Sequence, residues 1–120
     1  MARVTGFGGF FFAADDPAAL AVWYLEHLGI PGAPRSYDEA PWTQEAGATV
    51  FEPFPAGGDA LPAGKRWMLN LRVDDLDGLV ASLRAAGIAV EVDATPYPNG
   101  RFASLVDPEG NPLQLWEPAT

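Results

Sequence analysis

Residues 15–30 read DDPAALAVWYLEHLGI, and residues 74–88 read DDLDGLVASLRAAGI. Both stretches open on a pair of aspartates and close on a glycine followed by an isoleucine, and they lie about half a chain length apart. Self-similarity of this kind is the signature of a repeated structural unit. The chain is therefore predicted to contain two copies of one unit, each built around the repeated stretch.

Each repeated stretch carries the start and stop signals of a helix. Asp16 and Asp75 are placed to cap the first amide groups, and Pro17 suits the first helical position. Leucine, valine and aromatic residues recur between the caps at helical spacing. Gly29 and Gly87 stand where a left-handed C-terminal cap belongs. We therefore predict one helix between residues 15 and 30 and another between residues 74 and 88.

Short strands are predicted before and after each helix. In residues 68–73 the apolar residues alternate, so Met68, Asn70 and Arg72 should share the face turned away from the helix, which is either functional or simply exposed to solvent. The sequence Asp107-Pro108-Glu109-Gly110-Asn111 is a strong turn signal. The other predicted strands cover residues 7–13, 48–51, 89–92, 102–106 and 113–116.

Composition indicates one soluble domain of 120 residues, with 48% hydrophobic and 19% charged residues. A net charge of −9 argues against nucleic acid and against an anionic membrane surface as partners. The absence of cysteine excludes disulfides and thiolate catalysis, and it favours a cytoplasmic location. The apolar run at residues 10–14 is too short for a signal peptide or a membrane span.

Together these landmarks resemble the vicinal-oxygen-chelate superfamily, which includes glyoxalase I, extradiol dioxygenases and bleomycin-resistance proteins. The resemblance covers nearly the whole chain. It implies an α+β fold in which two β-α-β-β-β modules form a pair of curved sheets around a cavity, and a dimer in many members. Module 1 would span about residues 5–56, a linker about 57–64, and module 2 about 65–118. The carrying residues are Asp16-Pro17, Trp23-Tyr24, Leu28-Gly29-Ile30, residues 70–76, Gly100-Arg101-Phe102, residues 107–111 and residues 115–118.

The resemblance also points to four positions at which metal-dependent members carry His, Glu or Gln. Here these positions hold Gly9, Thr49, Met68 and Gln114. Glycine has no ligand atom, and methionine sulfur is too soft for the divalent ions of these enzymes. No carboxylate or imidazole remains to neutralise a divalent ion. We therefore expect no cofactor, with a divalent metal as the alternative.

Strand parity nominates the lining of a small-molecule cavity, because aromatic walls with a few polar groups are typical of such sites. Arg72 has a planar fork suited to an anionic or carbonyl-bearing ligand, or it pairs with one of the many acidic residues. The predicted lining is Phe11, Phe51, Met68, Asn70, Arg72, Gln114 and Trp116. Arg101 is a further candidate, for the rim, and the sequence leaves its facing open.

Three functions remain open at this point. The first is a metal-independent small-molecule-binding protein of the sequestering type, with an unassigned ligand and no assigned catalytic residue. The second is a glyoxalase-type lyase or a dioxygenase with atypical ligands such as Glu52, Glu117 or His27. The third is an interaction domain without a ligand. Four Trp and seven Phe exceed what so small a domain covers, so we also expect a homodimer.

Overall fold

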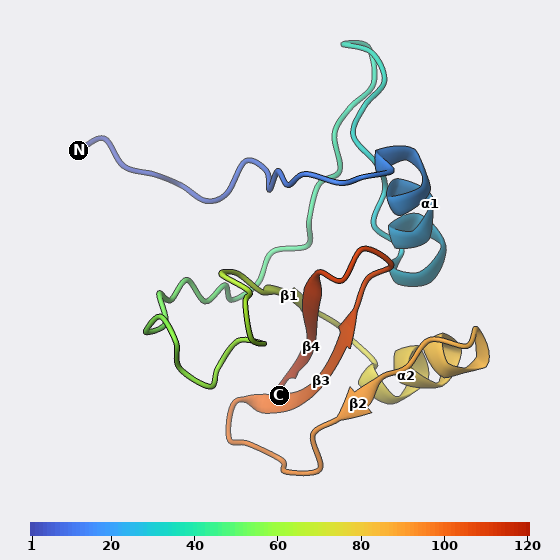
Figure 1. The fold of residues 1–120 in the computed structure, drawn as a ribbon. Helices are drawn as coiled ribbons and strands as arrows, with labels where there is room; N and C mark the ends of the chain where they lie inside the picture. The colour runs from blue at the N-terminus through green and yellow to red at the C-terminus, as the bar shows by residue number, and fades with distance from the viewer.

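Regular structure is concentrated in the second half of the chain, as seen in a computed structural model that describes residues 1–120 (Figure 1). Only one element, a helix, lies in the first half. In chain order the elements are α1 (Pro17–Leu28), β1 (Leu69–Arg72), α2 (Leu76–Ala85), β2 (Glu91–Val92), β3 (Gly100–Val106) and β4 (Pro112–Pro118).

Both helices begin and end at the predicted signals. The Asp16 side chain accepts a hydrogen bond from the Ala19 N–H at 3.1 Å, and the Asp75 side chain accepts one from the Gly78 N–H at 3.0 Å. After the helices, Gly29 and Gly87 adopt positive φ angles of 69° and 82°, which glycine reaches without steric cost. The prediction of two capped helices is confirmed.

The four strands form one sheet in the order β1-β4-β3-β2. Strand β1 runs parallel to β4, and the other two pairs are antiparallel. The β3–β4 pair is a hairpin closed by the predicted turn at residues 107–111. Module 2 is therefore a complete β-α-β-β-β unit, which confirms the prediction for that half and the α+β class.

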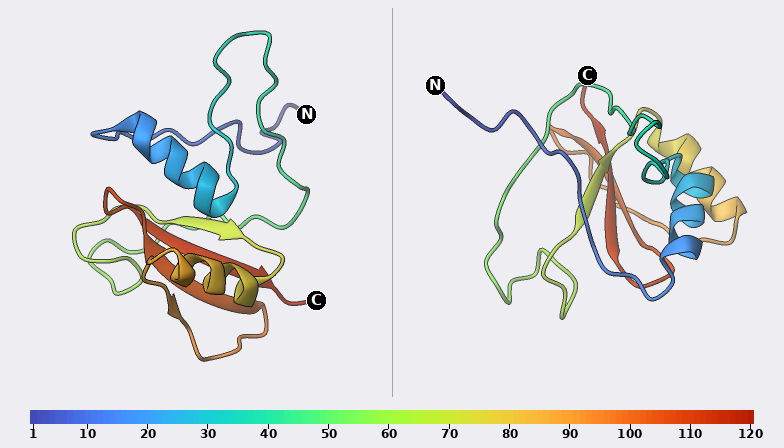
Figure 2. Two further views of the ribbon diagram at one scale, coloured as in Figure 1. Left: turned by 90° about the vertical axis from the view of Figure 1, so that its right-hand side faces the viewer. Right: turned by 90° about the horizontal axis from the view of Figure 1, so that it is seen from above.

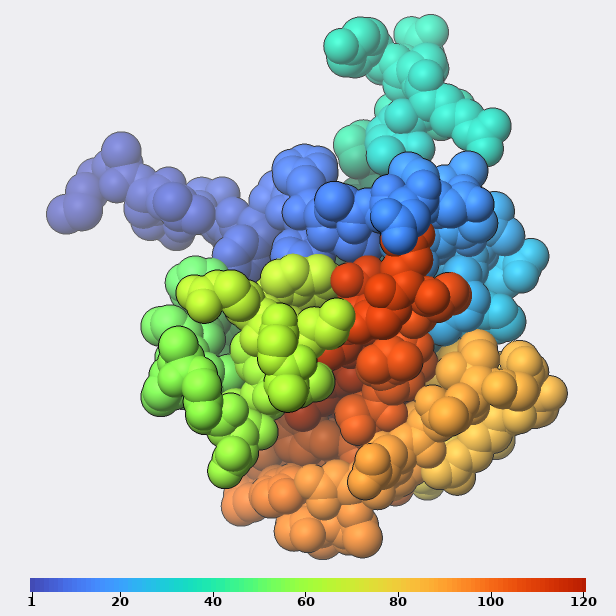
Figure 3. Space-filling view, viewed as in Figure 1, coloured from blue at the N-terminus to red at the C-terminus, as the bar shows by residue number.

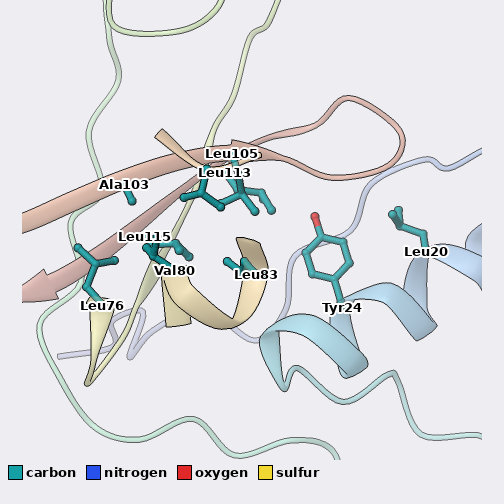
Figure 4. Close-up of a cluster of buried hydrophobic side chains, with 10 residues drawn as sticks. Leu20, Tyr24, Leu76, Val80, Leu83, Ala103, Leu105, Leu113 and Leu115 are labelled. Carbon is teal, nitrogen blue, oxygen red and sulfur yellow. The ribbon is translucent and has the colours of Figure 1, made fainter. Parts of the chain in front are cut away.

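The core lies between this sheet and the two helices, which cover the same face (Figure 2). Leu76 and Leu83 of α2 and Leu113 and Leu115 of β4 are fully buried (Figure 4). Helix α1 adds Leu20 and Tyr24 at one end of the cluster. Ten buried residues make up this core, so most of the hydrophobic stabilisation belongs to module 2.

The strands expected at residues 7–13 and 48–51 of module 1 are not formed. Both stretches run without regular structure, and residues 1–15 and 40–54 make no backbone-to-backbone hydrogen bond. A strand exists only through a paired neighbour, and these segments have none within the chain. The single chain thus contains one sheet instead of the pair expected around a cavity. The N-terminal segment and residues 31–45 project from the body (Figure 3).

No helix in the structure combines the length and the apolar character needed to cross a lipid bilayer.

Candidate ligand-binding face

The face of the sheet that carries no helix presents a small group of polar and aromatic side chains. Alternate residues of a strand point to opposite faces, so the pairings Asn70↔Gln114 and Phe102↔Trp116 assign these four residues to one face. Leu71 and Leu115, one position away, point into the core. We call this surface the open face; it consists of Asn70, Arg72, Phe102, Ser104, Gln114 and Trp116.

An amide pair lies at the centre of the open face. The Asn70 Nδ2 group donates to Gln114 Oε1 at 2.7 Å, across the parallel β1–β4 pair. This bond uses one donor and one acceptor, and it leaves the Asn70 carbonyl oxygen and the Gln114 NH₂ group for another molecule. The sheet therefore holds a preoriented donor and acceptor side by side, with the exposed Ser104 hydroxyl as the cross-strand neighbour of Gln114.

Next to the amide pair stands an aromatic wall. The rings of Phe102 and Trp116 are stacked with centroids 6.4 Å apart and an interplanar angle of 7°. Trp116 is held in place because its indole N–H donates to the Asn99 carbonyl at 2.8 Å. Tyr97 adds an edge-on contact to Phe102 at 5.7 Å. The sequence analysis missed Phe102, although counting outward from the turn at 107–111 would have paired it with Trp116.

Arg72 has a role that neither sequence interpretation foresaw. Its guanidinium donates to the Glu45 carbonyl at 3.0 Å and to the Ala48 carbonyl at 3.1 Å. Gly47 lies so close that a Cβ there would overlap the guanidinium. Arg72 thus fastens module 1 to the end of β1. It also lines an open cleft of about 420 Å³, with Glu45, Asp74, Asp75, Leu28, Val73 and Leu79.

Three predicted cavity residues, Arg101, Phe11 and Phe51, lie elsewhere. Arg101 points to the helix side, where it forms an ion pair with Asp77 of α2 at 2.8 Å, because residue 101 has the parity of Glu117 and not of Trp116. Phe11 and Phe51 are 93% and 82% exposed, since their strands are not formed. Met68 precedes β1 and lines an apolar groove of about 380 Å³ that includes Ser104 of the open face, so it lies beside that face as predicted. The other lining residues are Pro62, Ala89–Val90, Glu91, Leu105–Val106 and Pro112–Leu113.

The family's metal positions do not converge on a coordination site. Gly9 and Thr49 lie in the unpaired segments, and Gln114 is engaged with Asn70. No group of three or more His, Cys, Asp or Glu side chains is close enough to hold a metal ion. The four family positions therefore do not bring a set of donor atoms together in this structure.

The atypical donors considered above are also dispersed. The Glu117 carboxylate accepts from the Leu76 N–H at 2.9 Å on the helix side of the sheet. His27 lies on α1 with its ring 5.5 Å from that of Trp23. Glu52 is exposed in module 1. The three side chains therefore have different neighbours and do not form one group.

The most perturbed acid–base pair in the molecule serves to anchor a turn. The Tyr24 hydroxyl donates to Asp107 Oδ2 at 2.6 Å, and burial together with this bond raises the pKa of Tyr24. Burial alone would raise the pKa of Asp107, but hydrogen bonds from Tyr24, Asn111 and the Glu109 N–H outweigh it and lower that pKa. All of these partners are internal, so the pair joins α1 to the β3–β4 turn.

A second contact fixes α1 to the same turn. The Glu109 carboxylate accepts from the backbone N–H groups of Asp15 and Asp16, at 2.6 and 3.1 Å. A carboxylate at this end also complements the helix dipole. The turn of module 2 therefore holds the start of the module 1 helix.

Comparison with known proteins shows the family to which this chain belongs. Residues 9–116 match the family model described as the glyoxalase-like domain. The uncharacterized protein YaeR of Escherichia coli (strain K12) is 34% identical over 116 residues, covering 87% of this chain and 89% of that protein. The chain belongs to the glyoxalase-like domain family of the vicinal-oxygen-chelate superfamily.

Two solved structures share the fold over nearly the whole chain. TnmS3, an antibiotic binding protein from Streptomyces sp. CB03234, is 26% identical with a TM-score of 0.66, and the match covers 99% of this chain and 100% of that one. Lactoylglutathione lyase from Agrobacterium tumefaciens is 20% identical with a TM-score of 0.60, covering 97% and 96%. Because the sequence identity to the lyase is only 20%, this similarity indicates a shared fold and nothing about function.

Proposed function

We propose that this protein binds a small organic molecule on the open face, without a metal ion. The observation that carries the proposal is the Asn70–Gln114 amide pair beside the stacked rings of Phe102 and Trp116. A few convergent polar groups next to an aromatic wall are what a small-molecule site requires. The likeness to the antibiotic binding protein TnmS3 supports a sequestering role.

The side chains of the open face favour a particular ligand chemistry. A planar ring system suits the aromatic wall, and a carbonyl or amide edge suits the Asn70 and Gln114 groups that remain available. The chain carries a net charge of −9, which favours neutral or cationic molecules over anions. We therefore propose a planar, neutral or cationic ligand with a hydrogen-bonding edge.

The glyoxalase-type lyase and the dioxygenase are not favoured by the donor set. Both chemistries in this superfamily need a divalent ion held by His, Glu or Gln, and the candidate donors Glu52, Glu117 and His27 do not share a neighbourhood. The proposal of a binding protein therefore stands ahead of either enzyme.

Fluorescence titration with proflavine, a planar aromatic cation, tests the ligand part of the proposal. Phe102→Leu and Gln114→Ala should each weaken binding about tenfold, the loss of one stacking or hydrogen-bonding contact. Val22→Ala changes an exposed aliphatic side chain of α1, on the helix side, and should leave the affinity unchanged. Equal affinities in all four proteins would refute the assignment of the site.

Calorimetric titration with Ni²⁺, Co²⁺, Mn²⁺ and Zn²⁺ tests the metal part. We expect no saturable heat at one ion per chain. Stoichiometric binding of any of these ions that Gln114→Ala abolishes would overturn metal independence and restore the enzyme alternative.

We also propose that the protein is a homodimer. The chain leaves large apolar side chains of module 1 exposed, including Phe7, Val50 and Phe51, and surfaces of this kind are usually covered by a partner. Light scattering after size exclusion should give about twice the 12.8 kDa chain mass. A mass that stays at one chain on concentration would contradict the dimer.

A further inference from the structure

The central hairpin of the sheet presents three cross-strand pairs on the open face, one after another along its length. The register of β3 and β4 gives the pairs Phe102↔Trp116, Ser104↔Gln114 and Val106↔Pro112. Successive pairs are two residues apart, so all three lie on the same face of the sheet, about 7 Å from one pair to the next. Along the strands this face therefore changes from an aromatic band to a polar band and then to an aliphatic band.

The aliphatic band lies in the apolar groove of about 380 Å³ described above. Val106 and Pro112 both line this groove, and so does Ser104 of the polar band. The groove is thus continuous with the Asn70–Gln114 amide pair, because Ser104 is the cross-strand neighbour of Gln114. A molecule held by the amide pair can therefore extend into the groove along the surface of the sheet.

The side chains of the groove favour an aliphatic occupant over an aromatic or charged one. No aromatic side chain lines the groove, and Glu91 is the only charged residue among its ten lining residues. The Glu91 carboxylate and the Ser104 hydroxyl are its only strong hydrogen-bonding side chains. Met68 adds a flexible thioether that adapts to an apolar neighbour. An aliphatic chain would therefore meet mostly apolar surface along the groove.

Much of this apolar surface is left uncovered by the chain itself. The Val106 side chain is 56% exposed, Pro62 and Ala89 are exposed, and Met68 is half-buried. These residues are contiguous, since all of them line one groove. Contiguous apolar surface beside polar groups is typical of ligand-binding grooves. The groove is therefore suited to take part of a ligand.

We propose that the apolar groove is a second subsite of the open face and takes an aliphatic chain of the ligand. The ligand is then an elongated molecule in which a planar aromatic ring is joined through a carbonyl or amide group to an aliphatic chain. The ring lies on the aromatic wall, the carbonyl or amide group bonds to the amide pair, and the chain lies over Val106. This inference rests on the proposed function, because the groove is a subsite only if the open face binds the rest of the molecule.

Titration with N-methyl, N-propyl and N-hexyl naphthamide tests the subsite, with naphthalene fluorescence as the readout. The three compounds share the ring and the amide group and differ only in the length of the aliphatic chain. Each methylene that leaves water in the groove should tighten binding about two- to fourfold. No increase with chain length, while the N-methyl compound binds, would overturn the subsite and leave the proposed function standing.

Val106→Thr and Val22→Thr form a matched pair of variants, because the two valines are 56% and 51% exposed and only Val106 lines the groove. Threonine keeps the branched shape and the strand preference of valine but places a hydroxyl under the chain. The ratio of N-hexyl to N-methyl affinity should fall about fivefold in Val106→Thr and keep its wild-type value in Val22→Thr. Equal ratios in all three proteins would place the chain on another apolar surface and overturn the subsite.

Phe102→Leu separates a failure of the subsite from a failure of the proposed function. This variant should weaken the binding of all three naphthamides by the same factor, since each places its ring on the aromatic wall. If none of the three compounds binds to the wild type, the proposed function loses its support and the subsite falls with it. If all three bind with one affinity and Phe102→Leu weakens them equally, the subsite alone falls.

Discussion

The two modules follow the same sequence plan, yet only module 2 completes it within one chain. A helix needs only local hydrogen bonds and caps, and both modules have these. A sheet needs a nucleating turn, and here the modules differ. In module 2 the Asp107 carboxylate accepts from the N–H groups of Glu109 and Asn111 and so closes the β3–β4 hairpin. Module 1 has Glu45-Ala46-Gly47 at the matching place, and the Glu45 carboxylate accepts no hydrogen bond from the backbone that follows, since only the Glu45 carbonyl is engaged, by Arg72.

Two modules with the same sequence pattern therefore need not be equally able to form their sheet within one chain. Burial shows the same contrast, since only Leu20 and Tyr24 of module 1 are buried and both pack on the core of module 2. Module 2 should therefore determine the stability of the isolated chain, while module 1 depends on what covers it. The following substitutions test this division, from the largest expected effect to the smallest.

Leu115→Ala should have the largest effect on stability. Leu115 is completely buried in β4, and truncating a buried leucine leaves a cavity that costs about 2–5 kcal/mol. Tyr37→Ala, in the exposed loop of module 1, should change the free energy of unfolding by less than about 0.5 kcal/mol. Urea denaturation followed by tryptophan fluorescence measures both. Similar losses from the two variants would end the distinction between the modules.

Asp107→Ala should lower the free energy of unfolding by about 2–3 kcal/mol. The change leaves the buried Tyr24 hydroxyl without its acceptor and opens the turn. Tyr24→Phe removes only the hydroxyl and should cost less, about 1 kcal/mol. If Asp107→Ala were no worse than Tyr24→Phe, the turn contacts of Asp107 would contribute nothing.

The same pair predicts the pH dependence of stability. The folded-state pKa of Asp107 lies below its unfolded value, so its contribution is present above about pH 4 and is lost as the pH falls further. The folded-state pKa of Tyr24 is raised, so its contribution is present below about pH 10 and is lost as the pH rises beyond that. Thermal melts of Tyr24→Phe across this range should lack part of the alkaline decline. An unchanged alkaline limb would assign that decline to other groups.

Gly100→Ala should destabilise the protein by about 1–2 kcal/mol. Gly100 has a φ of 134°, and a Cβ there would overlap the Glu117 carbonyl and approach the Trp116 indole nitrogen. Gly32→Ala, in module 1, meets no neighbouring atom and should be neutral. Chemical denaturation of the two variants compares a closely packed glycine with one in open space. Equal denaturation midpoints would contradict the close packing of Gly100 against Glu117 and Trp116.

Asp77→Asn should have the smallest effect. It breaks the exposed ion pair with Arg101 on the surface of α2, and such pairs contribute little in water. The urea midpoint should match that of the wild type, and a clear loss of stability would mean that Arg101 does more than pair at the surface.

The sequence predicted the parts of the fold that local signals determine. Capping aspartates, terminal glycines and the turn at 107–111 located both helices and all four strands of module 2. Parity then placed Asn70, Gln114 and Trp116 on one face. It failed for Phe11 and Phe51 because parity acts only within a formed strand. The direction of Arg101 was left open by the sequence, and its pairing with Glu117 in the β3–β4 register turns it to the helix side.

The contacts of Arg72 lay beyond any sequence pattern. Its partners are the backbone carbonyls of Glu45 and Ala48. Because every residue has a backbone carbonyl, the residue types do not indicate which carbonyls Arg72 binds. Phe102, in contrast, was within reach, since the hairpin register follows from the turn.

The hydrogen bonds between the β3–β4 turn and α1 determine the order in which the parts of the molecule fold and associate. Glu109 holds the N–H groups of Asp15 and Asp16, and Asp107 holds Tyr24, so α1 docks on its own chain once the hairpin has formed. Residues 1–14 and 40–54 make no backbone-to-backbone hydrogen bond and remain available to a second copy. Refolding should therefore show a fast phase independent of protein concentration, followed by a slower phase whose rate rises with concentration as the proposed dimer forms.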